Sequence, residues 1–167
     1  DEQLHLKDNY LGFIVIKPLS KTFIGRTCLK IQEDIECESN RSILTKKYVA
    51  NVYGLKFEVE SVAFQEQDKV LSACATTALW SLFHASNYFP HNGIPSPSEI
   101  TLNALSDRPL LINGFPSRGL QTSEVIRALE YYKLKCHQTK VSFLSEQSIT
   151  DFSSKVRFSI DSGTPLF

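Results

Sequence analysis

The chain has 167 residues, of which 42% are hydrophobic, 11% aromatic and 22% charged. This length and composition are typical of one globular domain, or of one domain with a small appendage, and exclude disordered and collagen-like chains. Eighteen basic residues balance eighteen acidic ones, so there is no long-range positive field to attract nucleic acid or an anionic membrane surface. We therefore expect neither a nucleic-acid partner nor a membrane partner.

Cysteine content and the first residues indicate the compartment. The four cysteines, Cys28, Cys37, Cys74 and Cys136, form neither a Cys-x-x-Cys pair nor a dense disulfide framework. No apolar run reaches the length of about 18 residues that spans a bilayer, and the opening DEQLHLKDNY is too polar for a secretory signal. We expect a soluble chain in a reducing, cytoplasmic setting. The start at Asp1 and the lack of methionine indicate a processed or incompletely represented polypeptide.

The first third of the chain is predicted to be β-structure. Residues 12–16 and 24–31 form two short apolar runs separated by a polar connection. Residues 47–52 and 55–64 bracket a Tyr-Gly pair, and apolar residues alternate along the second of these runs, which predicts a hairpin. Because strands this short do not bury one another in pairs, we expect all of them to form one antiparallel sheet packed on the rest of the chain.

From Ser72 onward the spacing of apolar residues becomes that of helices. Ser72 is the predicted N-cap of a first helix, which ends before Pro90. A second helix is predicted over residues 96–105, because SPSE combines a capping serine, a proline at the first helical position and a glutamate three residues after the cap. A third helix is predicted to begin near Thr122.

The last part of the chain is predicted to alternate between strand and helix. Residues 134–141 read as a strand, and residues 145–162 read as a partly helical segment that ends at Gly163 as a C-terminal cap. Residues 164–167 are expected to enter a buried strand.

Cys74 is the best candidate for chemistry. With Ser72 as the cap, Cys74 takes the second helical position, where unpaired N–H groups and the helix dipole favour a thiolate. Such a thiolate is a nucleophile for acyl transfer if a histidine accepts its proton and a donor holds the oxyanion. Gln67, seven residues upstream, carries an amide that could be this donor. The alternative is a generic α+β protein in which Cys74 only packs in the core.

The segment FQEQDKVLSACATTALWSLFH, which contains both residues, resembles the glutamine-to-cysteine segment of papain-like cysteine peptidases. The resemblance is to the bacterial branch related to the peptidases that remove double-glycine leader peptides. It continues through SPSEITLNAL and GLQTSEVIRALEYYKLKC to DSGTPLF, and so covers about residues 64–167. It implies an α+β fold with a papain-like helical lobe and an antiparallel β-sheet. Residues 1–63 have no counterpart in the family's minimal domain and are expected to form an N-terminal β-rich extension.

The resemblance also implies roles for individual residues. Cys74 would be the nucleophile and Gln67, with Gln65 as its rival, the oxyanion donor of a hydrolase that cleaves peptide or amide bonds in a peptide or protein substrate. No cofactor is implied. The family's histidine follows on a strand of the β lobe, often in a Gly-His pair, with Asp or Asn after it. This order would place the histidine shortly after Phe167, so the papain-like domain is expected to be truncated before that strand.

Two questions stay open from the sequence. Within the chain, His84 is excluded as the base because ten helical residues place it about 15 Å along the helix from Cys74, whereas His91 and His137 remain alternatives. The alternative function is a catalytically silent papain-like module that binds peptides or proteins, with the N-terminal β region as its docking element. Phosphate-loop and H-E-x-x-H patterns are missing, so we expect no nucleotide and no metal.

Overall fold

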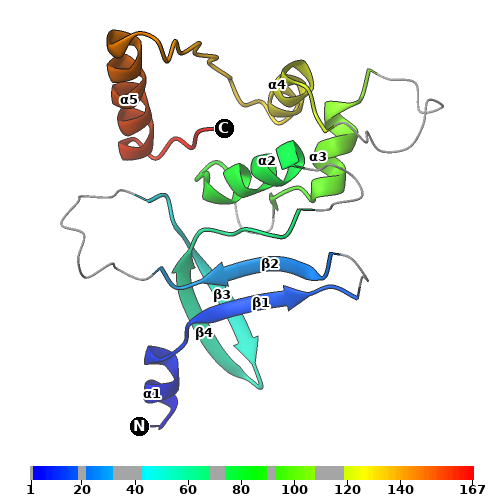
Figure 1. The fold of residues 1–167 in the computed structure, drawn as a ribbon. Helices are drawn as coiled ribbons and strands as arrows, with labels where there is room; N and C mark the ends of the chain where they lie inside the picture. The colour runs from blue at the N-terminus through cyan, green and yellow to red at the C-terminus, as the bar shows by residue number, and fades with distance from the viewer. Residues whose placement is uncertain (1, 19–21, 32–42, 68–73, 90–92, 108–118) are drawn as a thin grey trace.

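A computed structural model describes residues 2–18, 22–31, 43–67, 74–89, 93–107 and 119–167 (Figure 1). The described residues form five helices and four strands, which confirms the mixed α+β class. In chain order these are α1 (Glu2–Asp8), β1 (Gly12–Ile16), β2 (Ile24–Leu29), β3 (Lys46–Val52), β4 (Leu55–Ser61), α2 (Cys74–Ala85), α3 (Pro97–Ala104), α4 (Thr122–Tyr131) and α5 (Glu146–Asp161). None of these helices is long and apolar enough to cross a membrane.

The strands form two antiparallel hairpins, β1–β2 and β3–β4, each a two-stranded sheet of its own. The predicted hairpin at Tyr53 and Gly54 is confirmed, and both turn residues have positive φ, 49° and 83°, as the twist of a tight hairpin requires. The expectation of a single sheet was wrong. The hairpins lie across one another (Figure 1), and Tyr10 stacks on Phe57 with ring centroids 4.8 Å apart. Apolar surface is therefore covered by packing between hairpins and not by extending one ladder.

The three middle helices follow the predicted pattern. Ser96 caps α3 by accepting from the N–H of Glu99, whose carboxylate accepts in turn from the N–H of Ser96, so the predicted capping box is present. α3 is joined to α4 through Arg127, which donates to the Ala104 carbonyl oxygen at 2.7 Å and pairs with Asp107 at 2.6 Å. The predicted cap Ser72 and boundary Pro90 lie outside the described residues.

The end of the chain differs from the prediction in its strands. α5 is present and ends at Asp161, Ser162 is its C-cap residue, and Gly163 follows with a φ of 73°, the left-handed conformation common just after a helix. Residues 134–141 and 164–167 are not strands. A strand requires a neighbour for its N–H and C=O groups, and no described strand pairs with either segment. The α1 helix, which lies before the first predicted strand, was not predicted.

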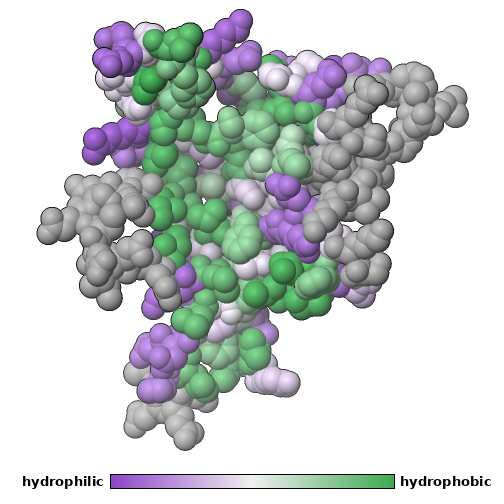
Figure 2. Space-filling view, viewed as in Figure 1, coloured by the Kyte–Doolittle hydropathy of each residue, from purple (hydrophilic) through white to green (hydrophobic). Residues whose placement is uncertain are grey.

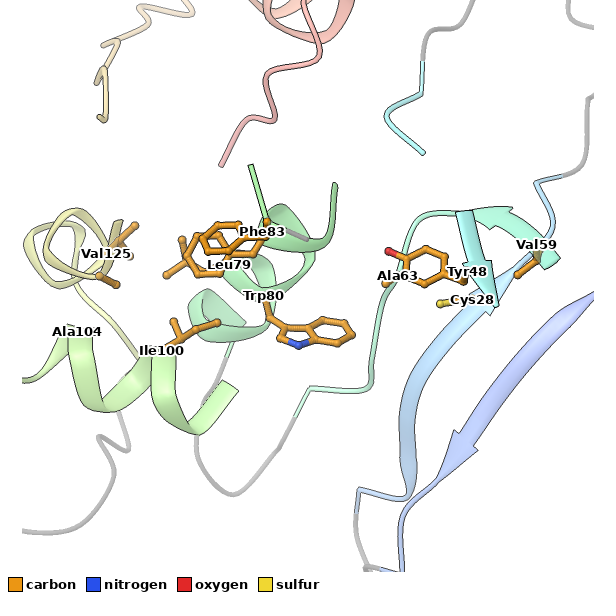
Figure 3. Packing of buried hydrophobic residues seen from close by; sticks show 12 residues of the cluster. Cys28, Tyr48, Val59, Ala63, Leu79, Trp80, Phe83, Ile100, Ala104 and Val125 are labelled. Atoms are coloured by element: carbon orange, nitrogen blue, oxygen red, sulfur yellow. The ribbon is translucent and has the colours of Figure 1, made fainter. Parts of the chain in front are cut away.

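The buried side chains form one continuous cluster. One group comes from α2, α3 and α4, another comes from the β hairpins, and Trp80 lies between them (Figure 3). No residue of α5 is buried. Exposed apolar side chains remain on α5 and β1, among them Phe158 and Ile16, and Figure 2 shows apolar surface on this face of the molecule. The core is therefore built by α2, α3, α4 and the β hairpins, and α5 adds no buried side chain to it.

Two glycines with positive φ allow the role of the hairpins in stability to be tested. At Gly12 an added Cβ would overlap the backbone oxygen of Cys28 on β2, whereas at Gly54 it would meet nothing within 4 Å. We expect Gly54→Ala to lower the free energy of unfolding by about 1–2 kcal/mol, the cost of placing a side chain in the left-handed region. Gly12→Ala adds the clash and should cost roughly 3 kcal/mol. Equal losses in urea unfolding would show that β1 does not approach β2 closely at Gly12.

Candidate functional site

The candidate site lies where α2 begins. Cys74 lies at the N-terminal end of α2, where the sequence predicted it; it is the first residue of the helix and not the second, and its side chain is exposed. The Cys74 Sγ donates to Oε1 of Gln67 across 3.0 Å, and Gln67 is exposed as well. The two residues that the sequence paired are thus in direct contact, at a place that molecules from solution can reach.

Gln67 is positioned by the segment that precedes it. Phe64 exchanges two backbone hydrogen bonds with Thr27 of β2, at 2.8 and 3.1 Å. Two residues further along, the Glu66 N–H donates to the Ile24 carbonyl oxygen at 3.2 Å, and the Ile24 N–H donates to the Glu66 carboxylate at 3.2 Å. Residues 64–66 therefore run antiparallel to β2 and pair with its second edge, opposite β1. We call this pairing the β2 ladder.

Cys74 is positioned by the anchoring of α2 on both sides. Toward α3, the hydroxyls of Thr76 and Thr101 lie 3.0 Å apart and both residues are buried. Toward β3, the His84 Nδ1 and the Tyr48 hydroxyl oxygen are 3.1 Å apart. At the far end of the helix, Lys46 Nζ donates to the Phe89 carbonyl oxygen at 2.6 Å. The helix that carries the thiol is therefore fixed to α3 and to β3 independently of Gln67.

The remaining candidate residues lie apart from this contact. Gln65, the rival donor, is half-buried, and among the described residues it makes no hydrogen bond to Cys74. His84 is buried against Trp80, with ring centroids 4.1 Å apart, in keeping with its exclusion as the base. His137 is exposed in the irregular segment between α4 and α5. His91 lies outside the described residues.

The other cysteines have different surroundings. Cys28 is completely buried in β2, and this burial raises the pKa of its thiol to about 11. Cys136 is exposed, and partial desolvation together with the nearby Glu130 carboxylate raises the pKa of its thiol. Cys37 lies outside the described residues. Within the described part of the chain, no group of three or more His, Cys, Asp or Glu side chains could hold a metal ion.

The Cys74–Gln67 contact has a defined chemical capacity. A protonated thiol donates to the amide oxygen, as observed. A thiolate can only accept, so it would call for the amide nitrogen of Gln67, which is attached to the same carbon as Oε1. Rotation of the amide by half a turn exchanges the two atoms. One side chain can thus serve the thiol in its resting state and donate to negative charge that develops next to the sulfur.

Comparisons of the chain with family models, with curated proteins and with solved structures gave no match. The papain-like relationship therefore stays a prediction that depends on the motifs quoted above. The sequence did not predict the role of Glu66 in the β2 ladder. Its only sequence signal is its place directly before Gln67, and nothing local indicates that Ile24, 42 residues earlier, is its partner.

The difference between Cys28 and Cys74 gives a direct test of the site's accessibility. In a chain carrying Cys37→Ser and Cys136→Ser, we expect dithiodipyridine at neutral pH to modify Cys74 promptly and Cys28 only after unfolding, because Cys28 is buried and protonated. Adding Cys74→Ser should abolish the prompt reaction. Prompt reaction of both thiols in the folded chain would contradict the burial of β2 beneath its neighbours.

Proposed function

We propose that this chain is a cysteine-nucleophile hydrolase of peptide or amide bonds, with Cys74 as the nucleophile and Gln67 as the oxyanion donor. The observation that supports this proposal is the 3.0 Å contact between the Cys74 thiol and the Gln67 carboxamide at the beginning of α2. The resemblance of residues 64–167 to papain-like peptidases supports the same two roles.

The proposed reaction has two stages. The Cys74 sulfur attacks the substrate carbonyl carbon, a C–S bond forms, and the carbonyl electron pair moves to the oxygen, which accepts a hydrogen bond from the Gln67 amide nitrogen. The C–N bond then breaks, the leaving amine takes a proton, and a thioester remains. Water hydrolyses the thioester through a second oxyanion at the same position and restores the thiol.

A general base must take the thiol proton before attack. His84 does not fit this role because its Nδ1 lies at the Tyr48 hydroxyl, in the contact that holds α2 to β3. His91 and His137 can be tested by substitution. Loss of hydrolysis on changing one of these histidines to alanine, with Cys74 still open to alkylation, would identify the base.

The proposal predicts how a carbonyl analogue binds. An acetylated tripeptide ending in glycinal has no side chain at its reactive end, and its aldehyde adds the Cys74 sulfur at carbon and the proton at oxygen, with no leaving group. We expect Gln67→Ala to weaken this binding up to about tenfold, the effect of one lost hydrogen bond to the hydroxyl oxygen of the adduct. Gln65→Ala, the matched control, should change it less than twofold, and Cys74→Ser should abolish covalent addition.

Three results would count against the proposal in different ways. A larger loss with Gln65→Ala than with Gln67→Ala would move the donor to Gln65. If neither Gln65→Ala nor Gln67→Ala affected addition of the aldehyde to Cys74, neither glutamine would be the oxyanion donor. If Cys74→Ser bound the corresponding tripeptide alcohol as tightly as the unchanged chain binds the aldehyde, the chain would be a catalytically silent module that binds peptides, the alternative function.

A further inference from the structure

Glu66 contacts Ile24 at two points. Its N–H donates to the Ile24 carbonyl oxygen and its carboxylate accepts from the Ile24 N–H, each at 3.2 Å. The backbone and the side chain of Glu66 are thereby both fixed to one residue of β2. A two-point contact restricts rotation of the segment about a single hydrogen bond, so it determines the direction in which the chain leaves β2 at residue 67.

Gln67 depends on that direction. It is exposed, and its side chain has several rotatable bonds, so holding its amide against the Cys74 sulfur costs conformational entropy unless the backbone is already aligned. The other contact of the ladder, between Phe64 and Thr27, lies three residues upstream of Gln67. Glu66 is the last residue before Gln67 that a described contact fixes to β2.

The hairpin behind this contact is itself closely held. β2 pairs with β1 along its length, with Gly12 opposite Leu29 at one end and Ile16 opposite Ile24 at the other. It also packs against β4 through the Ser61 hydroxyl, which donates to the Leu29 carbonyl oxygen at 2.6 Å. A shift of β2 would therefore carry Ile24, Glu66 and Gln67 with it. The N-terminal β region is connected to the candidate site through four hydrogen bonds of the β2 ladder.

We infer that Glu66 is a positioning residue for Gln67, and that the β1–β2 hairpin is through it a working part of the candidate site and not a separate appendage. This inference rests on the proposed function, because it assigns to Glu66 the alignment of the oxyanion donor. Glu66 itself contacts neither the sulfur nor the substrate carbonyl. Its effect is confined to steps that need the Gln67 amide.

Two reagents separate positioning from general damage to the site. Addition of the glycinal tripeptide to Cys74 develops a polar oxygen that Gln67 can bind. Alkylation by iodoacetamide forms a C–S bond at a saturated carbon and releases iodide, so it creates no oxyanion. We expect Glu66→Ala to weaken aldehyde binding about fivefold and to leave the alkylation rate within twofold. Glu66→Gln keeps an oxygen that accepts from the Ile24 N–H and should restore binding.

Glu60→Ala is the matched control. Glu60 also accepts a hydrogen bond, from the Thr45 hydroxyl at 2.6 Å, but it lies on β4 and not in the β2 ladder. This variant should bind the aldehyde as the unchanged chain does. In a chain already carrying Gln67→Ala, adding Glu66→Ala should have no further effect, because the group that Glu66 positions is gone.

The outcomes distinguish a failure of the positioning role of Glu66 from a failure of the proposed hydrolase function. If the unchanged chain forms no adduct at Cys74, the proposed function fails. If the adduct forms but Glu66→Ala binds the aldehyde normally, only the positioning role of Glu66 fails. That role fails also if Glu66→Ala and Glu66→Gln are equally impaired, if alkylation slows as much as aldehyde binding weakens, or if the Glu66→Ala effect persists without Gln67.

Discussion

The β2 ladder is the constraint on which the candidate site depends. Four hydrogen bonds join residues 64–66 to Thr27 and Ile24, three between backbone groups and one through the Glu66 carboxylate. Each such bond contributes about 0.5–1.5 kcal/mol net, which is modest, but together they fix an extended segment in register. Gln67 follows this segment directly. Gln67, which the sequence alone does not distinguish from an ordinary surface residue, is thereby held at a defined place beside α2.

The thiol reaches the same place by a separate route. α2 is anchored through buried contacts. Trp80 lies between the helical and β parts of the core (Figure 3), and His84 contacts Tyr48 of β3. The sulfur and the amide therefore belong to elements that are each fixed to the β hairpins. Their 3.0 Å contact then requires ordering of the two side chains but not of the elements that carry them, and a donor held in advance stabilises a developing charge more effectively.

Local signals account for what the sequence predicted well. The Ser96–Glu99 capping box and the turn at Gly54 are each specified within a few residues, and the structure contains both. The single sheet and the strand at residues 134–141 were wrong because strand pairing is decided by distant partners. Alternating apolar residues do not reveal whether a partner exists. The helix-start pattern around Cys74 predicts its position, whereas no residue near Glu66 in the sequence indicates that it pairs with Ile24.

The protection of backbone amides from hydrogen exchange tests the ladder most directly, because three of its four hydrogen bonds have a backbone N–H as donor to a backbone oxygen. The account predicts that the N–H groups of Phe64, Glu66 and Thr27 exchange slowly, at rates near those of the β3–β4 hairpin around Tyr48. Exchange of Phe64 and Glu66 as fast as that of the exposed segment around Lys135, with the β3–β4 hairpin still protected, would contradict it. Gln67 would then not be held against Cys74 by β2.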